Sequence, residues 1–127
     1  MIDHLSLGVA DFARSLPFYD ALLRPLGFRL MSNTGAEAGF GNETAGTPFY
    51  LYPVEVAARG PVAAPGTHVA FACPDAAAVD AAFAAAMAAG AAEARAPARR
   101  PELSAHYYGA IVLDPDGHRL ELVASLA

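Results

Sequence analysis

Several residue types are scarce in or missing from this chain. Its 127 residues include one cysteine and no tryptophan, and all eight of its basic residues are arginines. A single cysteine excludes an intrachain disulfide framework and fits a reducing compartment, so we expect a cytoplasmic protein. The lack of lysine excludes lysine Schiff-base chemistry. No apolar run approaches the roughly 20 residues of a membrane span and none follows a basic start, which predicts no membrane partner.

Charge and composition narrow the possible partners further. The formal net charge is −5, and the eight arginines form no strongly basic cluster. An acidic surface repels phosphate backbones, so we expect no nucleic-acid partner. Hydrophobic residues make up 55 % of the chain and charged residues 17 %, which is typical of a globular domain rather than a disordered one. The length predicts a single domain.

The sequence reads as one unit used twice. His4 and His68 each lie in an alternating apolar pattern typical of a strand. Asp11 and Asp75 follow at equal distances, each able to cap the helix that comes next. Short strand candidates complete each half, at 28–31, 38–42 and 48–52, and at 91–94, 107–113 and 118–123. We therefore predict two modules, about 1–57 and 66–127, joined by a Pro/Gly linker at 58–65.

Each module has the predicted order strand–helix–strand–strand–strand, which gives an α+β fold. The alternation leaves one face of each sheet for a helix and the other face open and partly polar. We expect the two βαβββ modules to form a curled mixed sheet around a central cavity.

Three residues face this expected cavity by their phase in the strands, namely His4, His68 and Glu121. Two imidazoles and one carboxylate suit a divalent metal ion (Fe²⁺, Mn²⁺, Zn²⁺ or Ni²⁺) and leave positions open for substrate or water. Glu121 stands between two leucines, where a carboxylate is costly unless it is paired or bound to a metal. The alternative is a structural pair of histidines.

Other side chains share the same phase. Tyr50 and Tyr107 are candidate catalytic hydrogen-bond donors or general acids, with simple packing as the alternative. His106 lies at the mouth of a loop predicted at 95–106, where it either meets substrate or is merely solvated. The candidate substrate-binding residues are Ser6, Tyr52, His106 and Ile111.

Two stretches of sequence carry a family resemblance. Residues 3–11 read Asp-His-Leu-Ser-Leu-Gly-Val-Ala-Asp, and residues 114–122 read Asp-Pro-Asp-Gly-His-Arg-Leu-Glu-Leu. With Gly66-Thr67-His68 between them, the chain resembles the vicinal oxygen chelate superfamily of glyoxalase I, extradiol dioxygenases and bleomycin resistance proteins. Tyr107-Tyr108 is similar to an uncharacterised glyoxalase-like branch. The resemblance implies paired βαβββ modules, a homodimer, and a metal ion that binds two neighbouring oxygens of a small-molecule substrate.

Departures from the pattern of individual families limit the choice. Tyr50 stands where glyoxalase I has a fourth, carboxylate ligand, which disfavours a glutathione-dependent lyase. Ile111 and the lack of lysine disfavour a fosfomycin-type enzyme. We therefore expect a metal-dependent enzyme of the dioxygenase or lyase/isomerase type. The alternative is a metal-free protein that binds or sequesters a small molecule or drug, similar to bleomycin resistance proteins.

Overall fold

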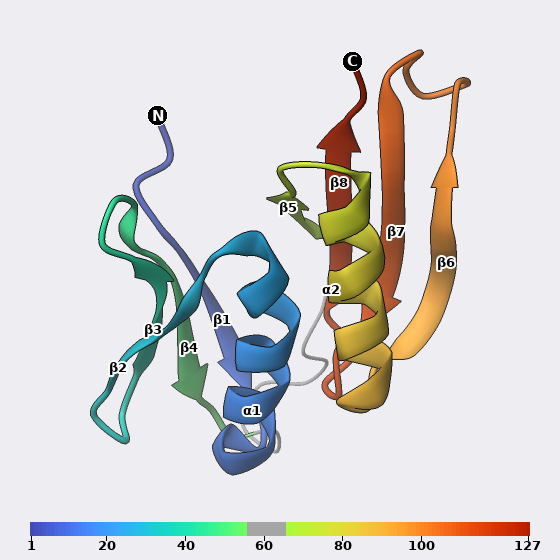
Figure 1. Ribbon diagram of the computed structural model, residues 1–127. Helices are drawn as coiled ribbons and strands as arrows, with labels where there is room; N and C mark the ends of the chain where they lie inside the picture. Colours follow the sequence, from blue (N-terminus) through green and yellow to red (C-terminus); the bar gives the residue numbers. More distant parts are fainter. Residues whose placement is uncertain (56–65) are drawn as a thin grey trace.

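The computed structural model describes residues 1–55 and 66–127, so the predicted linker at 58–65 lies outside the described residues. Each half of the chain forms one strand, one helix and three further strands (Figure 1). The first half consists of β1 (Leu5–Val9), α1 (Phe12–Leu23), the short 3-10 helix η1 (Arg24–Leu26), β2 (Arg29–Asn33), β3 (Ala38–Asn42) and β4 (Gly46–Pro53). The second half consists of β5 (Val69–Ala72), α2 (Ala76–Ala88), β6 (Ala92–Arg99), β7 (Tyr107–Leu113) and β8 (Arg119–Ser125).

The two halves have the same sheet topology. Their strand orders are β1-β4-β3-β2 and β5-β8-β7-β6, each a sheet of four strands. The first strand of each half runs parallel to the last, and the other neighbours are antiparallel. The α+β class and the repeated βαβββ order are as predicted. Within one chain the strands form two open sheets.

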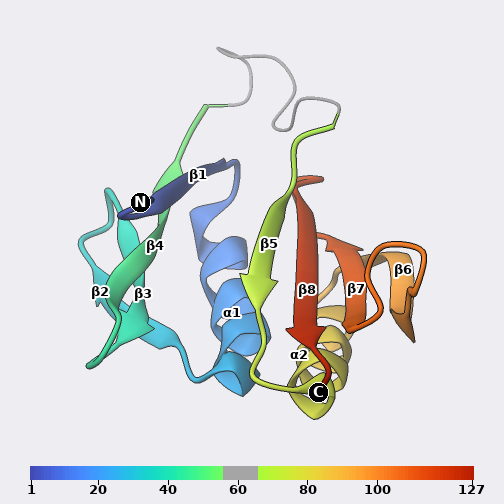
Figure 2. The ribbon, with the colours of Figure 1, turned by 90° about the horizontal axis from the view of Figure 1, so that it is seen from above.

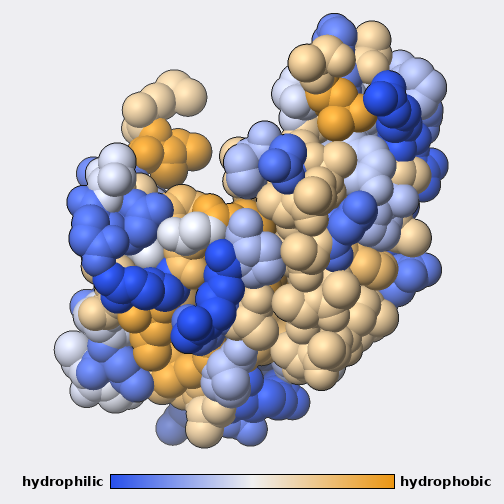
Figure 3. Space-filling model, in the orientation of Figure 1, coloured by the Kyte–Doolittle hydropathy of each residue, from blue (hydrophilic) through white to orange (hydrophobic). Residues whose placement is uncertain are grey.

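The helices begin where the sequence predicts. The carboxylates of Asp11 and Asp75 accept hydrogen bonds from the backbone amides of Arg14 and Ala78, at 3.0 and 2.8 Å, and so cap the two helices. Helix α1 runs through Pro17 without ending there. Helix α2 is largely alanine, and its side of the molecule presents a weakly hydrophobic surface (Figure 3). None of the helices in residues 1–55 and 66–127 is long and apolar enough to cross a bilayer.

One core joins the two modules. Helices α1 and α2 pack against each other between the sheets, so that each sheet has a helix on one face (Figures 1 and 2). The rings of Phe49 on β4 and Phe71 on β5 meet edge to face, with centroids 5.3 Å apart. The side chains that alternate with these core residues lie on the opposite faces of the sheets, and His4 and His68 directly precede β1 and β5. We call these opposite faces the outer faces.

The turn between β7 and β8 links the second module to the first. The Asp114 carboxylate accepts hydrogen bonds from the Tyr19 hydroxyl at 2.6 Å and from the His118 amide at 2.8 Å. The His118 ring donates through Nε2 to the Gly8 carbonyl at 2.8 Å, and Asp116 accepts from the Ala10 amide at 3.1 Å. His118 directly follows the turn, where a polar side chain is ordinarily exposed, but its contacts with β1 leave it only 7 % exposed.

Strand β6 is longer than the sequence indicated. The predicted strand at 91–94 extends to Arg99, so much of the expected loop at 95–106 is strand. The sequence did not predict this extension because of Pro97, since proline cannot donate a backbone hydrogen bond to a neighbouring strand and usually argues against a strand. It falls in a register shift between Arg95 and Ala98, where the regular pairing with β7 is interrupted. This places Arg95 in the second sheet.

Cys73 follows β5 and is buried, with 7 % of its surface exposed. Burial raises the pKa of its thiol to about 11. Because the thiolate is the reactive form, about one thiol in a thousand is ionised at pH 8. We expect the native protein to react with a disulfide reagent at least a hundredfold more slowly than the urea-unfolded protein at that pH. Equal rates in the two states would show that Cys73 is accessible and ionised normally.

Candidate functional site

The predicted site residues of the first module lie on the outer face of its sheet. Ser6 on β1 pairs in register with Tyr50 on β4. The His4 ring meets the Tyr50 ring edge to face, with centroids 5.6 Å apart. The Tyr50 hydroxyl forms a hydrogen bond with Thr47 at 2.8 Å, and the Tyr52 hydroxyl donates to the exposed carboxylate of Glu37 at 2.6 Å. The imidazole of His4 remains half exposed, so it is accessible to a ligand.

The second module brings His68 and Glu121 together on its outer face. Nε2 of His68 lies 3.4 Å from Oε2 of Glu121, and the Glu121 side chain is only 14 % exposed. This separation is too long for a charge-assisted hydrogen bond, which spans about 2.7–2.9 Å. Two donor atoms, each about 2.1 Å from a tetrahedral ion, lie about 3.4 Å from each other. The two side chains therefore fit adjacent ligand positions around one divalent ion.

Tyr107 holds the other oxygen of this carboxylate. Its hydroxyl donates to Oε1 of Glu121 at 2.6 Å, which leaves Oε2 directed towards His68. The ring lies over Gly109, where an added Cβ would come within 2.5 Å of the Tyr107 hydroxyl oxygen. Burial, followed by the hydrogen bond to Glu121, raises the pKa of Tyr107 above its ordinary value, while Arg95 acts in the opposite direction. At neutral pH the phenol is therefore protonated and acts as a donor.

Arg95 is a further residue of this site that the sequence did not predict. Its Nη2 donates to the Tyr107 hydroxyl at 3.3 Å, so the guanidinium belongs to the same hydrogen-bonded group as Glu121. The sequence predicts a loop at this position, whereas the structure has strand β6 there. The alternation of small and charged residues over 92–96 was the signal that pointed to a strand. Ile111 does lie beside Glu121, as the predicted phase required.

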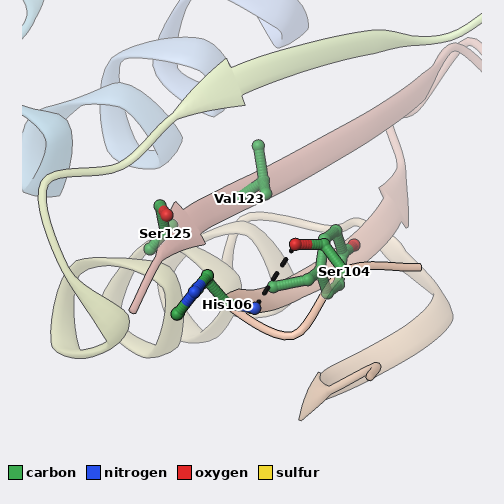
Figure 4. A pocket seen from close by; sticks show the side chains of 6 residues that line it. Ser104, His106, Val123 and Ser125 are labelled. Carbon is green, nitrogen blue, oxygen red and sulfur yellow. Dashed lines mark hydrogen bonds between the residues drawn. The ribbon is translucent and has the colours of Figure 1, made fainter. Parts of the chain in front are cut away.

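A pocket adjoins this group at the end of the hairpin. It has a volume of about 230 Å³ and lies between the loop before β7 and the last residues of β8 (Figure 4). Tyr107 and Val123 form its boundary towards Glu121. The predicted substrate residue His106 lines it, and its backbone amide donates to the Ser104 hydroxyl at 3.3 Å. The volume is below the range of about 300–1,000 Å³ typical of drug-sized ligands, so one chain offers room for a small molecule only.

The predicted residues thus form two groups, one on each sheet. His4 and the tyrosines of β4 are in the first, and His68, Glu121 and Tyr107 are in the second. Within the described part of a single chain, no group of three His, Cys, Asp or Glu side chains could hold a metal ion. A single chain therefore does not bring the three predicted ligands together. His68 and Glu121 would hold a metal ion in cooperation with a ligand from elsewhere.

Comparisons with known proteins agree with this architecture. A solved glyoxalase/bleomycin resistance protein from Albidiferax ferrireducens is 29 % identical, with 96 % of each chain covered and a TM-score of 0.80. A solution structure of an Agrobacterium tumefaciens protein is 28 % identical, covering 100 % of this chain and 98 % of its own, with a TM-score of 0.71. A glyoxalase/bleomycin resistance protein/dioxygenase family enzyme from Burkholderia phytofirmans shares the fold at 19 % identity, with 98 % of each chain covered and a TM-score of 0.74. The search among curated proteins finds no match.

The family is shown by a match that spans nearly the whole chain. The model of the glyoxalase/bleomycin resistance protein/dioxygenase superfamily matches residues 1–122. That range covers the first module and most of the second, with His4, His68 and Glu121 inside it. The chain belongs to the glyoxalase/bleomycin resistance protein/dioxygenase superfamily.

Proposed function

We propose that the protein is a divalent-metal-dependent enzyme acting on a small molecule with two neighbouring oxygens, by dioxygenase or lyase/isomerase chemistry. The observation that carries the proposal is the separation of 3.4 Å between Nε2 of His68 and Oε2 of Glu121, which suits two ligands of one ion. When bound, such an ion would act as a Lewis acid towards the substrate oxygens. Three protein ligands would leave positions open for substrate.

The side chains around this pair have complementary roles in the proposal. Tyr107 orients the Glu121 carboxylate through a hydrogen bond of 2.6 Å and remains protonated at neutral pH, so it can donate a hydrogen bond or a proton towards a substrate oxygen. Ile111 gives the floor beside Glu121 an apolar surface. Tyr50 supports the His4 ring on the other sheet, where Ser6 and Tyr52 would contact the far side of a substrate.

The proposal includes a homodimer, because within the described part of one chain His4 does not lie together with His68 and Glu121. In a symmetric pair the outer face of the first sheet of one copy would lie against the outer face of the second sheet of the other. His4 of one copy would then join His68 and Glu121 of its partner, and two equivalent sites would form. Both faces suit this pairing, since the helices in the described residues pack on the opposite sides of the sheets.

Metal content is the direct test of the proposed enzyme. Protein purified without chelator and without oxygen is expected to carry about one divalent ion per chain by elemental analysis. Iron or manganese would favour dioxygenase chemistry, and zinc or nickel would favour a lyase or isomerase. If no ion binds even after incubation with each metal, the enzyme proposal fails and a metal-free binding or drug-sequestering protein replaces it.

A mixing experiment tests whether the site is shared between copies. Co-expression of a His4→Ala chain with a Glu121→Gln chain produces mixed dimers in which one of the two sites has all its wild-type ligands. We expect about a quarter of the wild-type metal content in the mixture and almost none in either variant alone, if chains pair at random. No recovery in the mixture would place all three ligands within one chain and contradict the dimer.

A further inference from the structure

Arg95 lies beside the proposed metal site and forms no ion pair with an acidic side chain in residues 1–55 and 66–127. All thirteen acidic residues of the chain belong to the described part, yet none of the ion pairs there involves Arg95. Its hydrogen bond to a side chain in this part goes to the neutral hydroxyl of Tyr107, at 3.3 Å. Its Nε is buried and has no acceptor among the described residues. A guanidinium is always charged and carries five N–H donors, so N–H groups of this side chain remain available to bind a ligand.

The position of Arg95 in the sheet brings its side chain close to Glu121. Arg95 on β6 pairs with Ile111 on β7, which pairs with Glu121 on β8, so the three residues form one row across the outer face. The Tyr107 hydroxyl contacts both ends of this row. The distance between Nη2 of Arg95 and Oε1 of Glu121 is therefore at most the sum of these two hydrogen-bond lengths.

From this arrangement we infer that Arg95 binds a carboxylate of the substrate, and that the substrate is a small 2-hydroxy or 2-oxo carboxylic acid. The inference rests on the proposed function for the ion at His68 and Glu121. A planar guanidinium matches a carboxylate with two parallel hydrogen bonds. Because Arg95 lies close to Glu121, a substrate carboxylate bound to Arg95 would lie next to the substrate oxygens bound to the metal ion. With a divalent ion present, the positive charge of the site exceeds the single charge of Glu121, which favours an anionic ligand.

The pocket beside Tyr107 agrees with a compact acid. Its volume is about 230 Å³, and its lining combines Val123 and Tyr107 with the hydroxyl side chains of Ser104 and Ser125. An acid with a short apolar tail would place the tail against Val123 and its charged end at Arg95.

The competing explanation is that Arg95 only positions Glu121 through Tyr107. Binding of two matched probes separates the two roles. Lactate has a hydroxyl and a carboxylate on adjacent carbons, whereas propane-1,2-diol keeps the neighbouring oxygens and lacks the charge. We would titrate both into the full-length protein, with Zn²⁺ and after its removal, and follow the Arg95 Nε–H signal by NMR. This signal is observable because the atom is buried.

For the Zn²⁺-loaded protein we expect Arg95→Gln to weaken lactate binding about tenfold and to leave the affinity for propane-1,2-diol unchanged. Arg95→Lys keeps the charge but lacks the planar guanidinium, so its affinity for lactate should lie between those of the wild type and Arg95→Gln. Arg119→Gln is the matched control, because this arginine lies on the exposed surface of β8 and its loss should change neither affinity. A two-dimensional amide spectrum would confirm that each variant is folded.

In the metal-free protein, lactate should still shift the Arg95 Nε–H signal, more weakly, and the diol should not. Equal weakening of both probes by Arg95→Gln would assign Arg95 a positioning role and overturn the inference. So would an unshifted Nε–H signal at saturating lactate. A protein that binds no metal but shows the lactate shift would refute the proposed function while supporting the carboxylate site.

Discussion

Replacing His68 by alanine is expected to lower the affinity for the proposed divalent ion by at least about a hundredfold, with little change in the free energy of unfolding. The imidazole is about half exposed, so its removal leaves no cavity in the core. Its Nε2 would supply one of three protein ligands, and a site reduced to two loses most of its binding free energy. Competition with a chromophoric chelator measures the affinity, and urea unfolding of the metal-free protein measures stability.

His106→Ala is the matched control for this prediction. It removes the same side chain from the neighbouring pocket, at a position next to Tyr107 but outside the proposed ligand set. We expect unchanged metal affinity in this variant. If His68→Ala and His106→Ala bind the ion as tightly as the wild type, the assignment of His68 as a ligand is wrong. If both lose it equally, the ion is held by the pocket rather than by the Glu121 pair.

Replacing Asp114 by alanine is expected to lower the free energy of unfolding by about 3 kcal/mol. Its carboxylate is 4 % exposed and accepts hydrogen bonds from the Tyr19 hydroxyl and from the amides of Asp116 and His118. Alanine leaves these donors without their acceptor in a place that water does not reach. Tyr19 is fully buried in the core of the first module, so the loss also loosens the contact between modules. Urea unfolding monitored by circular dichroism measures the change.

The chain contains a matched exposed pair for comparison. The Tyr108 hydroxyl donates to Asp80 at 2.7 Å on the surface of α2, with the same chemistry as the buried pair of Tyr19 and Asp114. Water replaces a lost hydrogen-bond partner there, so Asp80→Ala should lower the free energy of unfolding by only a small fraction of the decrease expected for Asp114→Ala. Equal losses in the two variants would show that the turn between β7 and β8 does not hold the modules together.

Much of the fold was predictable from local patterns. Flanking turn residues placed β3 and β7 at the residues where the structure has them, and the aspartates at 11 and 75 identified both helix starts. The repeat of the pattern around His4 and His68 predicted two modules of the same order. These features depend on neighbours a few residues apart, and for that reason a single sequence reveals them. Only the start of β6 was predicted, because Pro97 interrupts its pairing with β7 farther along.

The candidate site was predictable only within each sheet. The phase of β8 put Glu121 on the same face as His68 and Ile111, and the structure agrees, because the register of paired strands follows from the alternation. The exposure of His118 could not be judged from its turn, since its burial comes from the Gly8 carbonyl 110 positions away. The same holds for the contact of Arg95 with Tyr107, which required the true length of β6.

By itself, then, the sequence determined the composition of the modules, the order of their elements and the face on which each polar side chain lies. Periodicity and capping act over a few residues, and they suffice for this. Only the tertiary structure decided how the modules pack: the helices meet between the sheets, and Asp114 and His118 join the second module to the first. Among the described residues of one chain, this packing separates His4 from His68 and Glu121 and leaves Arg95 without an acidic partner. Such relationships arise from long-range burial and hydrogen bonding, which no local pattern of residues specifies.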